Sequence, residues 1–72
     1  MIEKEQALLV QSRSLAAIRE LVAMLSEIKD HCPVEDFETI KRGVGLSIGT
    51  IQMDILEFIN KQYPEIDDLA EK

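Results

Sequence analysis

The sequence predicts an all-α protein, an antiparallel two-helix hairpin that pairs with a second copy into a four-helix bundle. Two long segments carry apolar residues at steps of three and four, the spacing of one helix face. A single short connection separates them, so two adjacent helices must fold back on each other. Strands have no support, since neither sustained alternation nor an Asn-Gly or Asp-Gly turn is present.

The first helix is expected over residues 3–30. This stretch contains no glycine or proline and is rich in Ala, Leu, Glu and Arg, which favour helices. Five apolar residues recur on one face: Leu8, Leu15, Ile18, Val22 and Leu25. This stripe is the surface that we expect the second helix to cover.

The connection is expected at residues 31–33, because the residue before a proline avoids helical backbone angles. Pro33 suits the first position of a new helix, where its missing N–H costs nothing. The acidic side chains of Glu35, Asp36 and Glu38 then fall near the positive end of the helix dipole. A second helix is therefore expected over 34–62.

That second helix contains all three glycines of the chain, Gly43, Gly45 and Gly49. Its apolar residues keep their steps of three and four through the glycines without a slip: Phe37, Ile40, Val44, Ile48, Ile51, Ile55 and Phe58. We therefore expect one continuous helix. The alternative is a break at Gly43, with Ser47 capping a new helix. Pro64 is expected to end the helix. Residues 64–72 are expected to form an acidic, weakly ordered tail, which could dock on the hairpin through Ile66 and Leu69.

A second apolar stripe on this helix predicts a further neighbour. On a helical wheel it lies about a third of a turn from the first, and the chain has no other long helix to cover it. Gly45 and Gly49 face the same way and would let another backbone approach closely. The predicted interface between chains consists of Gly45, Leu46, Gly49, Gln52, Met53 and Leu56.

Chain length also favours self-association. A chain of 72 residues rarely buries enough apolar surface alone for more than about 3–5 kcal/mol of stability. Disulfides, a metal or oligomerisation usually supply the rest. Cys32 is the sole cysteine, so no disulfide forms within one chain. A homodimer is the expected state.

The expected pairing of the helices places Gln11 level with Ile51 and Gln52, with Ser14 one turn along. A polar layer in an apolar seam often fixes register or oligomeric state. We expect Gln11 and Gln52 to form such a layer. A pocket for a small polar ligand and simple exposure to solvent are the alternatives.

Net charge argues against several function classes. Fourteen acidic and eight basic residues give a charge of −6, and the sole adjacent basic pair, Lys41-Arg42, is flanked by acids. Nucleic acid binding needs clustered cations, and anionic membranes repel acidic proteins. Polar residues interrupt the apolar stretch 43–59, and the N-terminus lacks the basic region of a signal peptide. We expect a cytoplasmic protein without membrane or nucleic acid partners.

No catalytic, cofactor or metal site is predicted. Asp30, His31 and Cys32 are adjacent, and a Cys/His pair can serve as nucleophile and base. Neighbouring side chains on a turn point apart, however, so a polar helix terminus is the simpler interpretation. A metal held across a dimer by His31, Cys32 and a carboxylate is a further alternative.

No motif is specific enough to name a family. The sequence predicts a non-enzymatic, homo-oligomeric helical protein that acts through protein–protein contact as an adaptor, regulator or subunit. One alternative is a bundle that binds a ligand or metal. Another is a small nucleic-acid-linked regulator that uses Lys41 and Arg42 doubled by symmetry.

Overall fold

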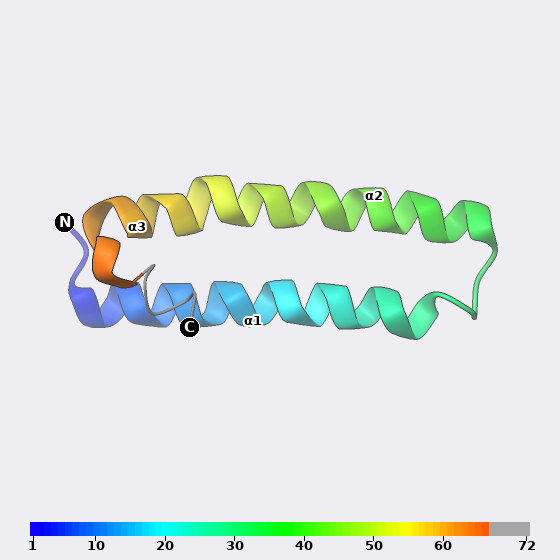
Figure 1. Cartoon of the computed structure of the whole chain (residues 1–72), viewed down its shortest axis with the longest axis horizontal. Coiled ribbons are helices and arrows are strands. Elements are labelled where there is room, and N and C mark those ends of the chain that lie inside the picture. Colours follow the sequence, from blue (N-terminus) through cyan, green and yellow to red (C-terminus); the bar gives the residue numbers. More distant parts are fainter. Residues whose placement is uncertain (67–72) are drawn as a thin grey trace.

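The computed structural model describes residues 1–66 of the chain, so the acidic stretch 67–72 of the predicted tail lies outside the described residues. Four helical elements follow in order: α1 (Lys4–Ile28), α2 (Val34–Thr50), the π-helix η1 (Ile51–Leu56) and α3 (Glu57–Gln62). Within residues 1–66 there is no strand, which confirms the predicted all-α class. Figure 1 shows α1 running antiparallel to the line formed by α2, η1 and α3.

The turn between α1 and α2 is held by local backbone bonds. The His31 N–H donates to the Ile28 carbonyl at 2.9 Å, and the Cys32 thiol donates to the same oxygen at 3.4 Å. Pro33 has an extended backbone (φ −58°, ψ 147°) and is the N-cap residue of α2, which begins at Val34, so it does not occupy the first helical position suggested by the sequence. Its carbonyl accepts the Phe37 N–H at 2.9 Å, which starts the ladder of the second helix.

The second rod, formed by α2, η1 and α3, is helical through all three glycines. Gly43 lies inside α2, so the alternative break at this residue does not occur, and no glycine has a positive φ. The three elements from α2 to α3 follow one another without an intervening loop. Tyr63 then leaves helical geometry (φ −136°, ψ 76°) immediately before Pro64.

The π-helix shifts the face of the rod that meets α1. Its i→i+5 bonding adds one residue to the turn, so side chains beyond it are rotated relative to a regular helix. Leu56 and Ile59 are buried, whereas Ile55 and Phe58 are exposed. The expectation that the stripe continues without a slip to Ile55 and Phe58 is therefore wrong. The step between Ile51 and Leu56 is five residues, which no regular α-helical stripe contains.

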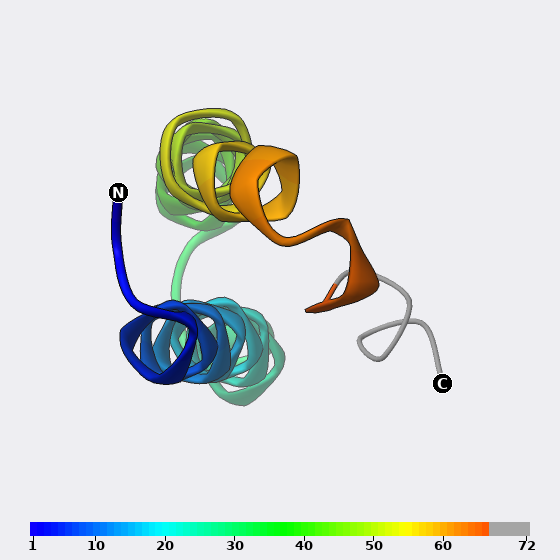
Figure 2. The ribbon, with the colours of Figure 1, turned by 90° about the vertical axis from the view of Figure 1, so that its left-hand side faces the viewer.

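The best-packed part of the core lies at the open end of the hairpin. Ala7, Ile59 and Ile66 are almost fully buried there, with Ile2, Val10 and Tyr63 packed against them. Residues 64–66, the returning segment, turn back across this end on the side opposite the N-terminus (Figure 2). The Tyr63 hydroxyl donates to the Ile2 carbonyl at 2.7 Å, which ties the start of α1 to the end of α3.

The molecule is a rod of 45 × 19 × 17 Å. Its radius of gyration is 14.7 Å, whereas a compact domain of this length has about 11 Å. Two helices side by side leave most of their surface facing solvent. The buried apolar residues among the described ones are accordingly few: Ala7, Val44, Leu56, Ile59 and Ile66.

Candidate functional site

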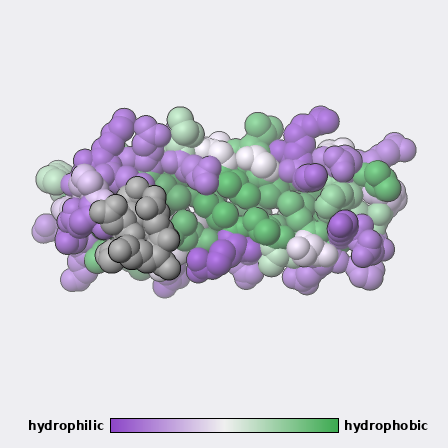
Figure 3. All heavy atoms as spheres, in the orientation of Figure 1, coloured by the Kyte–Doolittle hydropathy of each residue, from purple (hydrophilic) through white to green (hydrophobic). Residues whose placement is uncertain are grey.

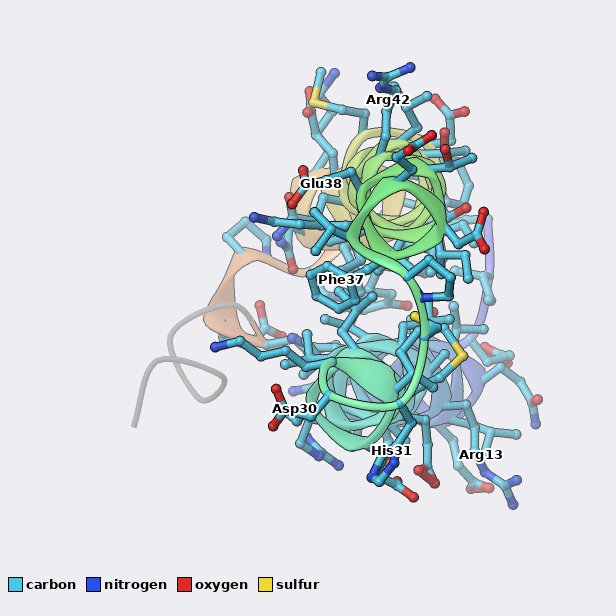
Figure 4. The ribbon with its side chains drawn as sticks, turned by 90° about the vertical axis from the view of Figure 1, so that its right-hand side faces the viewer. Arg13, Asp30, His31, Phe37, Glu38 and Arg42 are labelled. Atoms are coloured by element: carbon cyan, nitrogen blue, oxygen red, sulfur yellow. The ribbon has the colours of Figure 1, made fainter. Side chains whose placement is uncertain are left out.

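The outer face of α2, continued into η1, carries large apolar side chains that nothing in the described chain covers. Leu46 is 69% exposed and Met53 is 65% exposed. Leu46 follows the buried Val44 by two residues, so it points roughly 160° away from it on the helix. Arg42, one turn before Leu46, points away from α1 in Figure 4. This face is therefore directed away from the rest of the hairpin.

The six predicted interface residues do not all lie on the free surface. Gly45, Leu46, Gln52 and Met53 are exposed, and Gly49 is half-buried. Leu56 is buried within its own chain, because the π-helix turns it toward α1. A second chain could thus reach four apolar or small residues of the predicted interface: Gly45, Leu46, Gly49 and Met53.

The glycines make no close approach within the hairpin. A Cβ atom placed on Gly43, Gly45 or Gly49 would meet no atom within 4 Å beyond its local surroundings. The fold of the single chain therefore does not require glycine at any of the three positions. Each interior helical glycine costs about 0.5–1 kcal/mol relative to alanine, so the packing of the single chain does not explain this cost.

The predicted polar layer does not form between Gln11 and Gln52. Gln11 is buried, but its side-chain amide donates to the Ile66 carbonyl at 3.5 Å. Gln52 is exposed. The returning segment after Pro64 brings a backbone acceptor to Gln11, and the π-helix turns Gln52 out to solvent. The expected layer is therefore wrong. It assumed two regular helices packed in register, and such an arrangement contains neither a π-helix nor a returning segment.

Sequence reasoning missed a shallow groove between α1 and α2 near the turn. Its lining is Val22, Leu25, Ser26 and Lys29 from α1 and its C-terminal end, with Phe37 and Lys41 from α2. Figure 4 shows the Phe37 ring between the two helices. A sequence signal did exist, since each lysine follows an apolar lining residue by one helical turn: Lys29 follows Leu25, and Lys41 follows Phe37.

Apolar side chains also gather along the length of the hairpin. Figure 3 shows them as a band along the middle of the face from which the returning segment is seen, between two rows of polar side chains. Leu8 and Val22 of the apolar stripe on α1 are exposed, as is Ile40 on α2, so the expectation that the second helix covers the whole α1 stripe is wrong. Apolar side chains along the line where the two helices meet are therefore exposed to solvent.

The residues considered for chemistry are not brought together. Asp30 and His31 lie in the turn after α1 and point in different directions, with His31 directed away from α2 (Figure 4). The Cys32 thiol is half-buried and bonds to the Ile28 carbonyl. Across residues 1–66, no group of three or more His, Cys, Asp and Glu side chains is placed to hold a metal ion. The tail acids Asp67, Asp68 and Glu71 lie outside the described residues.

Electrostatic contacts concentrate at the open end. Lys4 Nζ lies 3.0 Å from Glu65 Oε2, with both side chains about half exposed. A hydrogen bond from the backbone of Glu65 itself, followed by the bond from Lys4, lowers the pKa of the Glu65 carboxyl below its ordinary value of 4.5. Lys61 and Glu57 form an exposed i,i+4 pair at 3.4 Å on α3.

No helix within residues 1–66 is long and apolar enough to cross a lipid bilayer. Comparison of the chain with protein-family models, with curated proteins and with solved structures finds no match. The exposed face of α2 and the groove near the turn are therefore the basis for inferring what the protein does.

Proposed function

We propose that this protein acts through protein–protein contact rather than catalysis, and that it self-associates through the outer face of α2 into a four-helix bundle. A two-fold dimer is the simplest closed arrangement, because the same patch on both copies then meets itself. Such a dimer would serve as a small adaptor, regulator or subunit in a larger assembly.

The observation that carries the proposal is the exposure of Leu46 and Met53 on a face directed away from α1. Fully burying a side chain of this size stabilises by about 1.5–3 kcal/mol, and two-fold symmetry buries each one twice. Gly45 directly precedes Leu46, Gly49 lies between Leu46 and Met53, and neither has a side chain that would hold a second backbone away. Close approach would recover dispersion energy that offsets their helical cost.

The available area supports an interface of ordinary size. A stable interface covers roughly 800 Å² on each partner. The chain exposes 5471 Å², so about a seventh of its surface would be covered. One side of the rod, 45 Å long and 17 Å wide, has a projected area of this order.

Light scattering and sedimentation test the proposal directly. The purified chain is expected at about twice its mass of 8.2 kDa. Leu46→Glu places a charge in the predicted interface and is expected to yield monomers, with the helical circular dichroism retained because residue 46 is exposed in the single chain.

Val34→Glu is the matched control, because Val34 is also exposed but lies at the first residue of α2, away from Leu46. This variant is expected to stay dimeric. A wild-type chain that remains monomeric at high concentration would overturn the proposal, and so would a Leu46→Glu variant that still dimerises.

A further inference from the structure

We propose that the groove at the turn end of the hairpin binds a peptide segment of a partner protein in which an apolar side chain stands beside carboxylates. We refer to this groove, lined by Val22, Leu25, Ser26, Lys29, Phe37 and Lys41, as the turn-end groove. It is separate from the outer face of α2 and goes beyond self-association.

The chemistry of the turn-end groove suits an amphipathic acidic ligand. Val22, Leu25 and Phe37 provide an apolar floor, and a lysine stands on each side: Lys29 at the end of α1 and Lys41 on α2. Neither lysine forms an ion pair with a residue of the described range. An apolar anchor would fill the floor while carboxylates meet the two ammonium groups.

The molecule already shows this binding mode at its other end. There, Ile66 is seated against Ala7 and Ile59, and is 1% exposed. The neighbouring carboxylate of Glu65 pairs with Lys4 at 3.0 Å. An apolar anchor and an adjacent carboxylate from one short segment thus close the open end of the hairpin.

The turn-end groove also combines apolar side chains with lysines, but no segment within residues 1–66 is seated in it as Ile66 is seated at the open end. It carries two lysines where the open end uses one, so it is suited to a segment with more than one carboxylate. Asp30 and Glu38 lie on the same side of the helices as the returning segment in Figure 4, but neither lines the groove. The charged side chains that line the groove are therefore the two lysines alone, in a chain whose net charge is −6.

The test uses a labelled peptide with the sequence of residues 64–72, PEIDDLAEK, because this segment contains the Glu65-Ile66 pair whose binding mode the structure shows. Fluorescence anisotropy at low salt is expected to show saturable binding. The double variant Lys29→Glu, Lys41→Glu is expected to weaken binding by at least about tenfold, as is replacement of the peptide's acids by their amides. Raising the salt concentration should also weaken binding.

Lys4→Glu is the matched control, because it reverses the charge of the lysine at the open end and leaves the turn-end groove intact. Binding by this variant is expected to be unchanged. If Lys4→Glu abolishes binding and the double variant does not, the peptide exchanges with the chain's own segment and the proposal is wrong. Absence of saturable binding also overturns it.

The same titration on Leu46→Glu separates this proposal from self-association. Leu46 does not line the turn-end groove, so peptide binding is expected to persist in the monomeric variant. Loss of peptide binding together with dimerisation would overturn the proposal, because the site would then require the second chain.

Discussion

Ile66 and its neighbours show how single residues close an otherwise open hairpin. Ile66 packs with Ala7, its carbonyl accepts from Gln11, and Glu65 pairs with Lys4. The Tyr63 hydroxyl adds a bond to the Ile2 carbonyl. All of these contacts join residues near opposite ends of the sequence, so together they fix the ends of both rods.

The pairing of Glu65 predicts a pH dependence of this closure. Its pKa is lowered in the folded chain, so the carboxylate stabilises the fold above its unfolded value of about 4.5, and this stabilisation is lost as the pH falls through the folded value. The protection of the Tyr63 and Ile66 amides, measured as their exchange rates relative to the intrinsic rates at the same pH, is therefore expected to fall below about pH 4.5.

Glu65→Gln is the control, because it removes the titrating group while keeping similar volume. Exchange in this variant should already be faster at neutral pH and should lose the part of the pH dependence that belongs to residue 65. An unchanged pH profile would contradict a role for the carboxylate.

The three glycines give a second prediction at the residue scale. Because a Cβ at Gly43, Gly45 or Gly49 would have no neighbour within 4 Å, alanine at each position should stabilise the monomeric Leu46→Glu background by about 0.5–1 kcal/mol in urea unfolding. Gly49→Leu in the otherwise wild-type chain should weaken dimerisation, since the larger side chain prevents close approach.

Ser12→Leu on the exposed side of α1 is the control for added bulk, and its dimerisation should match the wild type. A Gly49→Leu chain that dimerises as tightly as the wild type would refute close packing at residue 49.

At the scale of elements, the π-helix decides which side chains of the second rod face α1. A regular helix would direct Ile55 and Phe58 inward, and the added residue directs Leu56 and Ile59 there instead. The rod therefore has two apolar stripes in different directions along its length. Part of the apolar surface of η1 and α3, including Phe58 at 53% exposure, remains on the outside.

Deleting Asp54 tests this role of the π-helix. The deletion removes one exposed residue from η1, so that Ile51 and Leu56 become four positions apart and a regular helix places both on the α1 side. Stability to urea is expected to change by less than about 1 kcal/mol, because the π-turn is replaced by better hydrogen-bond geometry.

Deleting Thr39, an exposed residue in the regular part of α2, is the control. It rotates Phe37 by about 100° relative to Val44 and is expected to destabilise by about 2 kcal/mol or more. If the Asp54 deletion is as damaging as the Thr39 deletion, the π-turn does not act as a spacer.

At the scale of the whole molecule, the rod shape sets the need for a partner. A radius of gyration of 14.7 Å and a core concentrated at one end leave the middle of the hairpin thinly packed. A second hairpin against α2 would convert this two-helix layer into a bundle with a continuous interior.

Self-association predicts a melting temperature that depends on concentration. Dimer formation stabilises the folded state by mass action, so a hundredfold rise in protein concentration should raise the melting temperature by on the order of 10 °C. Circular dichroism melts across that range measure the shift. The Leu46→Glu variant should melt at one temperature throughout, and a concentration-independent wild type would argue against a dimer.

The sequence alone predicts the helical class, because periodicity and the absence of strand signals are properties of neighbouring residues. The turn around Pro33 and the continuity of the helix through the glycines follow from the same local rules. Among the predicted interface residues, the exposure of Leu46 agrees with its phase relative to Val44. The spacing of Val44 and Leu46 gives their relative directions correctly because α2 is a regular α-helix from Val34 to Thr50.

Tertiary structure alone decides the burial of Leu56, the exposure of Phe58 and Gln52, and the partner of Gln11. A π-turn costs hydrogen-bond quality within its own helix, so contacts with α1 and with the returning segment must compensate for it. Ile66 likewise gains its burial from residues near the opposite end of the chain. Local spacing determines where helices form, whereas the packing of distant segments determines which of their faces meet.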